Sequence, residues 1–156
     1  MSPTPPSLRI RDAAEADVAA LVAFNRAMAS ETEAKALDPV RLERGVRGLL
    51  ARPEAGFYLV AEHGGVVGGA LLVTPEWSDW RDGWFWWVQS VYVAPGARRQ
   101  GLYGALYAEV QARARAAGDV RGLRLYVERE NEDARAVYER LGMHETAYRL
   151  YEALLD

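Results

Sequence analysis

The segment Trp84–Gly104, WFWWVQSVYVAPGARRQGLYG, contains the pattern that decides the fold. Its first part, residues 84–93, is apolar and ends in β-branched and aromatic residues, which predicts a buried strand. Ala94-Pro95-Gly96 ends that strand, because proline has no N–H to donate and glycine permits a turn. Apolar residues then recur at helical spacing and predict a helix that begins near Gly101: Leu102, Ala105, Leu106 and Val110.

The loop between this strand and this helix is rich in arginine and glycine. The first N–H groups of a helix have no intrahelical partner and lie at the positive end of its dipole. Glycine lets an anion approach the backbone, and the side chains of Arg98 and Arg99 add charged donors. The pattern predicts a phosphate-binding loop. The alternative is an ordinary strand–loop–helix corner with solvated arginines.

Composition limits the classes of protein that need to be considered. The chain has 156 residues, half of them apolar and 26% charged, which predicts one globular domain over 8–156. Three prolines among residues 2–7 predict a flexible leader over 1–7. It has no cysteine, and its two histidines are far apart, so we expect no disulfide, thiol chemistry or metal site. The net charge of −3 gives no general attraction to nucleic acid. With no apolar run of about 20 residues and no hydrophobic signal segment, we expect a cytoplasmic protein without a membrane partner.

Periodicity predicts the remaining elements. They are a strand over 8–11, a helix from 12 or 13, a helix over 39–51, strands over 57–62 and 66–74, a loop over 75–83, a helix stop at 117–119, a strand over 123–127, a helix over 131–141 and a last extended segment over 144–154. The order β-α-α-β-β-β-α-β-α-β indicates an α/β (α+β) fold in which helices pack on a mixed sheet.

Two motifs in this order resemble the signatures of the GNAT family of acyl-CoA-dependent N-acetyltransferases, and the resemblance covers the chain after its leader. The family's acyl-CoA signature, Arg/Gln-x-x-Gly-x-Gly/Ala, is similar to Arg98-Arg99-Gln100-Gly101-Leu102-Tyr103. Tyr103 stands where a small residue is usual, and Gly104 follows it. The second signature resembles Asn131, Ala134 and Tyr138 on a helix that ends at Gly142-Met143. Without the resemblance, Asn131 would be a helix N-cap and Tyr138 a core aromatic residue.

The resemblance implies a mostly antiparallel sheet with a splayed central pair of parallel strands, flanked by helices. Acetyl-CoA would lie between the splayed strands as acyl donor, although a longer acyl group is also open. The backbone of Val91 and Val93 would pair with the pantetheine arm, and the amides of residues 99–104 would cradle the pyrophosphate, with no metal required. The implied cofactor-binding residues are Val91, Tyr92, Val93, Arg98, Arg99, Gln100, Gly101, Leu102, Tyr103, Gly104, Asn131, Ala134 and Tyr138.

The implied reaction is direct attack of an amine on the thioester. A backbone N–H near Val91 would stabilise the oxyanion by roughly 3–4 kcal/mol, and Tyr138 would protonate the departing thiolate. Gln89 stands where relatives often hold a glutamate, and its amide cannot usefully accept a proton. The base is therefore open between a water chain that ends on a carboxylate, an amine of low pKa, and a carboxylate from elsewhere: Glu31, Glu33, Glu76 or Glu128.

The acceptor pocket is expected from residues 29–38 and 75–83. Tryptophans gather around the second segment, with acidic residues beside them, and this combination suits a cation. The expected substrate contacts are Glu31, Trp77, Trp80, Trp84 and Gln89, while sheet filling or a dimer face is the alternative for the tryptophans. We expect acetylation of a small-molecule primary amine. A protein amine as acceptor, a non-catalytic acyl-CoA-binding regulatory domain, and a homodimer are left open.

Overall fold

The computed structural model describes residues 7–155, so most of the predicted leader lies outside the described residues. The chain divides into two compact units, Met1–Tyr126 and Val127–Asp156. The single domain expected over 8–156 stays a prediction. The described helices do not include one that is long and apolar enough to cross a membrane.

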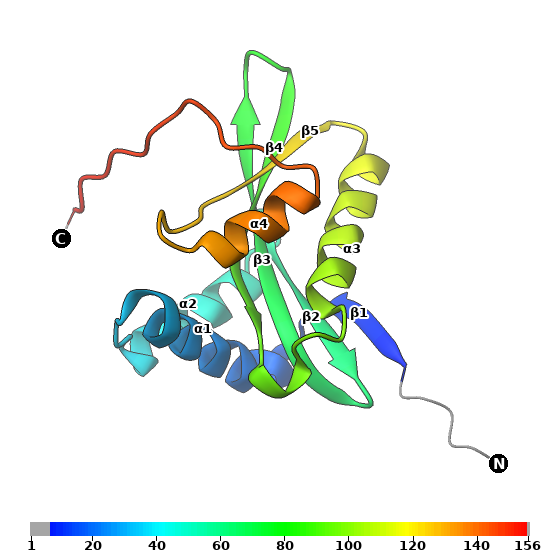
Figure 1. The fold of residues 1–156 in the computed structure, drawn as a ribbon, viewed down its shortest axis with the longest axis vertical. Coiled ribbons are helices and arrows are strands. Elements are labelled where there is room, and N and C mark those ends of the chain that lie inside the picture. The colour runs from blue at the N-terminus through cyan, green and yellow to red at the C-terminus, as the bar shows by residue number, and fades with distance from the viewer. Residues whose placement is uncertain (1–6, 156) are drawn as a thin grey trace. The chain divides into compact units, whose positions relative to one another are not determined.

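The first unit contains a sheet and three longer helices (Figure 1). Its elements are β1 (Leu8–Asp12), α1 (Val18–Glu33), α2 (Pro39–Leu50), β2 (Phe57–His63), β3 (Val66–Ser78), β4 (Gly83–Val93), α3 (Leu102–Ala117) and β5 (Val120–Leu125), with short 3-10 helices at Glu15–Asp17 and Pro95–Ala97. The second unit contains α4 (Glu132–Arg140). This order confirms the predicted sequence of elements as far as α4.

The five strands lie in the sheet in chain order, β1-β2-β3-β4-β5. Neighbouring strands are antiparallel except β4 and β5, which are parallel. The mixed α/β fold with its parallel strand pair is therefore confirmed, with β5 at the edge of the described sheet.

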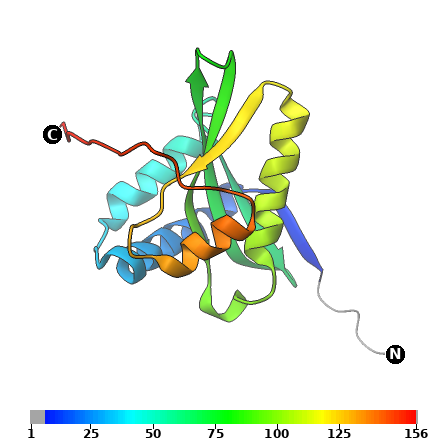
Figure 2. The same cartoon turned by 45° about the horizontal axis from the view of Figure 1, so that its top comes forward.

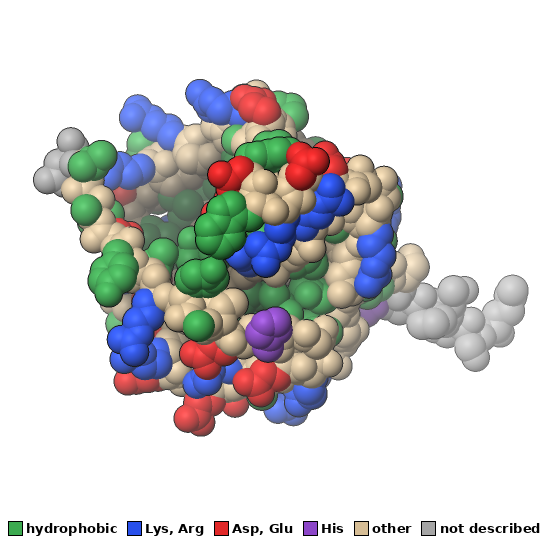
Figure 3. Space-filling model, turned by 90° about the horizontal axis from the view of Figure 1, so that it is seen from above, with side chains coloured by type: hydrophobic (Ala, Val, Ile, Leu, Met, Phe, Trp, Pro, Cys, Tyr) green, Lys and Arg blue, Asp and Glu red, His purple; other side chains and the backbone are tan. Residues whose placement is uncertain are grey.

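Helices cover both faces of this sheet, with α1 and α2 on one side and α3 on the other (Figure 2). The α3 face buries Leu71 and Leu106 completely, and the α1–α2 face buries Val60 completely. Full burial of one such side chain stabilises the fold by about 1.5–3 kcal/mol. On the face that Figure 3 shows, acidic and basic side chains are interspersed.

The segment 75–78 was predicted as loop, which is wrong, because it continues β3 and pairs with β4 as far as Ser78↔Gly83. Pro75 is tolerated because the pairing with β2 ends at Phe57↔Val73, so β3 is an edge strand from there on. Only residues 79–82 are left for the turn, which Asp82 closes with a φ of 48°.

Two further boundaries differ from prediction. The fifth strand covers 120–125 and not 123–127, because its ladder with β4 runs only from Trp84↔Val120 to Val88↔Leu125. Residues 144–155 form no strand, so the last extended segment was also wrong. Alternating apolar residues do not make a strand without a neighbour for its backbone groups. Large side chains in this segment are 70–96% exposed: Tyr148, Leu150, Tyr151, Leu154 and Leu155.

Candidate active site

A bulge in β4 organises the candidate site. Tyr92 pairs with Ala70 and Gln89 pairs with Leu72, so Ser90 and Val91 together oppose one residue of β3. Ser90 has a φ of 51°, an unusual value for a residue other than glycine. An extra residue reverses the alternation of side chains along the strand. Sequence reasoning missed the bulge, for which the adjacent polar residues Gln89 and Ser90 are a faint signal.

Just before the bulge, β4 leaves its parallel neighbour. The ladder with β5 ends at Val88↔Leu125, whereas β4 continues to Val93. The Ala94 N–H donates to the Gly68 carbonyl of β3 over 2.8 Å. Because successive backbone groups of a strand point to opposite edges, the amides of Val93 and Val91 face the edge that β5 has left. According to the family resemblance, the pantetheine arm of acetyl-CoA would pair with this edge.

The loop after β4 presents backbone N–H groups of the kind that bind anions. Arg99 and Gly101 have φ values of 63° and 79°, and helical residues follow Gly101 at once. Such a change of handedness makes a concave nest of N–H groups. The first helical bond runs from the Ala105 N–H to the Gly101 carbonyl, so the N–H groups of Leu102 and Gly104 precede the intrahelical ladder.

Open space surrounds the two glycines of this loop. Apart from its chain neighbours and the adjacent backbone of α3, a Cβ built on Gly101 or on Gly104 meets no atom within 4 Å. Packing against the rest of the protein therefore does not require glycine here. The positive φ of Gly101 and the free approach to the backbone are the physical reasons for these two residues.

Side-chain and backbone contacts hold the loop against β3 and the turn before it. A Cβ on Gly68 would lie 2.8 Å from the Cβ of Ala97 and 3.1 Å from Cδ2 of Leu102, so Gly68 permits the close approach of the 3-10 turn and the start of α3. Gln100 donates to the Gly96 carbonyl over 3.2 Å, and its Oε1 lies 2.8 Å from Nδ1 of His63. Gln100 thus has a structural contact as well as its predicted place in the cofactor motif.

The two arginines of the motif differ in their surroundings. Arg98 donates from Nε to the Val93 carbonyl over 2.9 Å and from Nη2 to Glu31 Oε2 over 3.0 Å. Its guanidinium also lies 5.6 Å from the ring centre of Tyr92. Arg99 is exposed at the surface of the loop. Of the two side chains, Arg98 already has protein partners for two of its donors.

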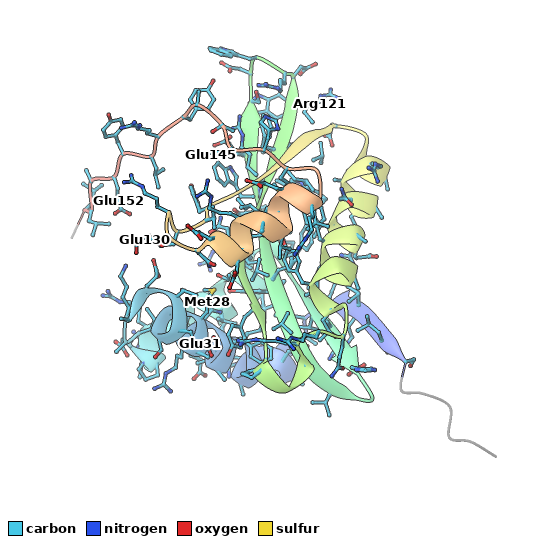
Figure 4. All side chains as sticks on the ribbon, viewed as in Figure 1. Met28, Glu31, Arg121, Glu130, Glu145 and Glu152 are labelled. Atoms are coloured by element: carbon cyan, nitrogen blue, oxygen red, sulfur yellow. The ribbon has the colours of Figure 1, made fainter. Side chains whose placement is uncertain are left out.

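Glu31, at the C-terminal end of α1, accepts hydrogen bonds from the far end of β4 and from the loop after it (Figure 4). The Tyr92 hydroxyl donates to its Oε1 over 2.8 Å. Hydrogen bonds from Tyr92 and from Arg98 lower the pKa of Glu31, while burial and the carboxylate raise the pKa of Tyr92. A carboxylate with two donors and a lowered pKa is a weak proton acceptor.

The other carboxylates of the predicted set are also engaged. Glu76 accepts from Nη1 of Arg124 over 2.8 Å. Glu33 lies 3.8 Å from the Lys35 ammonium in an exposed pair. Glu128, in the second unit, accepts from the backbone N–H of Glu130 over 2.7 Å. Each of the four candidate carboxylates thus has a hydrogen-bond or ion-pair partner.

The tryptophans lie on both faces of the sheet and do not form one wall. Trp86 packs into the core under α3, and Trp84 shares its face because side chains alternate along a strand. Trp77 pairs with Trp84, their ring centres 5.0 Å apart. Trp80, in the turn, is 87% exposed. Of the predicted substrate contacts, Trp77 and Trp84 therefore lie on the face opposite Trp87.

The face on which α1 and α2 pack carries the remaining candidates. Gln89 lies opposite Leu72, which packs under α1 and α2, and it donates to Thr74 Oγ1 over 2.6 Å. Two residues before Gln89, Trp87 stacks on Tyr126 with ring centres 4.5 Å apart. Arg124 lies over Phe85 at 3.6 Å from the ring centre. The sequence reasoning did not select Arg124 or Tyr126, since only the parallel register Trp87↔Arg124 brings them to this strand.

The second signature lies in the second unit. Asn131 Oδ1 accepts from the Ala134 N–H over 3.2 Å, so Asn131 is the N-cap of α4. Ala134 and Tyr138 follow on the same side of this helix, because residues four apart are neighbours on a helix surface. The cofactor and catalytic roles implied for these three residues stay predictions.

A splayed strand edge that runs into a glycine-rich helix start is the arrangement implied for acyl-CoA-dependent transferases. The model of the Acetyltransferase (GNAT) family matches residues 20–143. The chain belongs to this family and is an acyltransferase.

Solved structures agree with this assignment. A "possible acetyltransferase" from Clostridium difficile 630 is 40% identical, with 96% of this chain and 98% of that chain covered and a TM-score of 0.89. Two others, each 16% identical with a TM-score of 0.76, share the fold: a predicted acetyltransferase with acetyl-CoA from Clostridium acetobutylicum (94% of this chain, 96% of that chain) and the aminoglycoside N-acetyltransferase AAC(6')-Iy in complex with CoA (99% of each chain). No curated protein matches the sequence significantly.

Proposed function

We propose that this acetyltransferase transfers the acetyl group of acetyl-CoA to the primary amine of a small molecule by direct attack. The observation that carries the proposal is the edge of β4 beyond Val88, which β5 does not pair with and which leads into the nest at Gly101 and the start of α3. A main-chain edge suits an extended amide-containing arm, and a glycine-lined helix N-terminus suits a diphosphate. The residues present therefore fit acetyl-CoA, which supplies the activated thioester when bound.

The protein's own groups have separate tasks in this proposal. The Val91 N–H donates to the carbonyl oxygen as negative charge develops on it, and the Tyr138 hydroxyl is the proton donor for the leaving thiolate. A thiol of pKa about 8.5 is already a fair leaving group, so Tyr138 assists without being essential.

Removal of the amine proton is assigned to a water chain that ends on a carboxylate. The support is that Glu31 accepts two hydrogen bonds and that Gln89, which donates to Thr74, cannot act as a base. An alkylammonium of pKa about 10.4 costs roughly 4 kcal/mol to deprotonate at pH 7, so an acceptor amine of lower pKa would need less assistance.

We place the acceptor on the α1–α2 face of β4. This choice is supported by the side chains of Gln89 and Trp87, together with the Arg124–Glu76 pair, on that face. The aromatic ring of Trp87 and the polar groups beside it suit a compact ligand that carries both apolar surface and hydrogen-bonding groups. Trp77 and Trp84, which lie on the other face, are less suited to this role.

A panel of amines tests the proposal. Purified protein is titrated with acetyl-CoA by calorimetry, and thiol release is then followed with small amines, amino sugars and peptides. We expect turnover with a small amine. Turnover on peptides alone would move the acceptor to a protein amine, and binding without turnover on any amine would favour a regulatory acyl-CoA-binding role. Propionyl-CoA in the same assay decides whether a longer acyl donor is used.

A homodimer is also part of the proposal. Its support is the run of exposed apolar side chains over 148–155, since surface of this kind usually contacts a partner. Light scattering during gel filtration measures the mass directly, and a 17.3 kDa species at all concentrations would remove the dimer.

A further inference from the structure

One carboxylate contacts both segments of the proposed donor site. Glu31 Oε1 accepts from the Tyr92 hydroxyl over 2.8 Å, and Oε2 accepts from Arg98 over 3.0 Å. Tyr92 follows the bulge of β4, and Arg98 begins the cofactor motif. Glu31 comes from neither segment, because it lies near the end of α1, three residues before Ala34.

The local sequence of α1 does not explain a glutamate at this place. The C-terminal end of a helix carries partial negative charge, so acidic residues there are unfavourable. The last turn of α1 contains no basic residue, and its C-cap, Ala34, has a φ of 51°. Local preference would favour a lysine at position 31 and a glycine at position 34. The bonds to Tyr92 and Arg98 offset this local cost.

The two partners fix main chain that the proposed donor site uses. Tyr92 points to the α1 face, where its ring lies 5.4 Å from that of Phe24, so Val91 and Val93 on either side of it are held toward the opposite face. Arg98 joins the same carboxylate to the Val93 carbonyl over 2.9 Å. A shift of Glu31 would therefore be transmitted to the amides of β4 and to the loop together.

We propose that Glu31 is a positioning residue that couples the α1–α2 connection to the main chain that binds acetyl-CoA. The connection, residues 34–38, belongs to the segment expected to contact the acceptor. Glu31 therefore links the acceptor side to the donor side through Tyr92 and Arg98, and it does not take the proton from the amine. The inference rests on the proposed function, which it deepens.

The test is a double-mutant cycle on acetyl-CoA affinity. Glu31→Gln removes the charge and keeps the shape, and Tyr92→Phe removes the hydroxyl and keeps the ring against Phe24. Each is titrated by calorimetry at a temperature at which circular dichroism shows a folded protein. We expect each single variant to bind acetyl-CoA about threefold to tenfold more weakly than the wild type. The double variant should have the same affinity as the single variant that binds more weakly, because both changes break the same contact. Glu54→Gln, in an exposed turn, is the matched control and is expected to bind as the wild type does.

Turnover separates positioning from proton transfer. In Glu31→Gln we expect the KM for acetyl-CoA to rise more than kcat falls, and the dependence of kcat/KM on pH to keep its shape. Unchanged affinity, or additive losses in the double variant, would overturn the coupling. A loss of kcat above a hundredfold at unchanged affinity, with the acidic limb of the pH profile gone, would make Glu31 the base. If the wild type itself binds no acetyl-CoA, the proposed function fails instead.

Discussion

The glycines on either side of α3 offer a test of the donor site, because an alanine at either one introduces the same backbone strain. Gly101, before the helix, has a φ of 79°, and Gly118, after it, has a φ of 81°. A Cβ built on either meets nothing within 4 Å. Alanine at either position therefore introduces the same left-handed strain and no clash with the protein. The two sites differ in which end of the helix they occupy.

The expected effect on stability is similar for the two variants. An L-residue in the left-handed region costs about 1–2 kcal/mol. For a domain of this size, a loss of that magnitude lowers the melting temperature by about 2–8 °C. We expect Gly101→Ala and Gly118→Ala to melt within a few degrees of each other.

The expected effect on binding is not similar. At Gly101 the added methyl group projects into the space through which a phosphate reaches the nest, so at least one charged hydrogen bond is lost. Such a bond is worth about 1.5–3 kcal/mol, which corresponds to about tenfold to a hundredfold weaker binding of acetyl-CoA. Gly118→Ala is expected to bind within twofold of the wild type.

Calorimetric titration with acetyl-CoA measures both variants under one set of conditions. Gly101→Glu extends the series, because a carboxylate at the positive end of α3 recovers part of the lost stability while it repels the diphosphate. The reasoning is refuted if Gly101→Ala and Gly118→Ala bind equally well, since strain alone would then account for the first variant.

Three further predictions concern other parts of the chain. Gly68→Ala should weaken acetyl-CoA binding severalfold, because its Cβ would lie 2.8 Å from that of Ala97 and displace the loop; calorimetry showing wild-type affinity would contradict this. Tyr138→Phe should lower turnover with little change in acetyl-CoA affinity, and equal rates of thiol release would exclude this hydroxyl as the acid. Asp17 has a pKa lowered by the hydrogen bond from Arg11, so its stabilisation is present above the unfolded pKa of about 3.9 and is lost as the pH falls through the folded value. Asp17→Asn should therefore lower the free energy of unfolding in urea by about 2 kcal/mol at pH 7, and a gap to the wild type that does not shrink below pH 4 would contradict that assignment.

Sequence patterns predicted the elements whose residues carry their own signal. The apolar run before Pro95, the helical spacing after Gly101 and the glycine stop at Gly118 are local, and the structure has each of them. The register of β5 and the continuation of β3 through Pro75 depend on which backbone groups find partners in other strands. These interactions between distant segments are not visible in composition or periodicity.

The candidate site divides in the same way. The loop that leads from β4 into α3 could be predicted, because glycine and arginine beside a helix start have a direct physical meaning, and its binding of an anion stays a prediction. The bulge at Ser90 could not, since nothing in the residue itself demands a φ of 51°. For the same reason the bonds from Tyr92 and Arg98 to Glu31, which span 61 and 67 residues, were not foreseen, and Glu31 was considered as a base.

The way in which β4 serves both ligands has a consequence for how the specificity of such an enzyme can change over time. In the proposed site, strand β4 meets the donor through its peptide groups and meets the acceptor through the side chains of Trp87 and Gln89. Peptide groups are the same for every amino acid except proline, so replacement of those two side chains can alter the preferred amine while the binding of coenzyme A is retained. A single strand can in this way keep one ligand constant and leave the other open to selection.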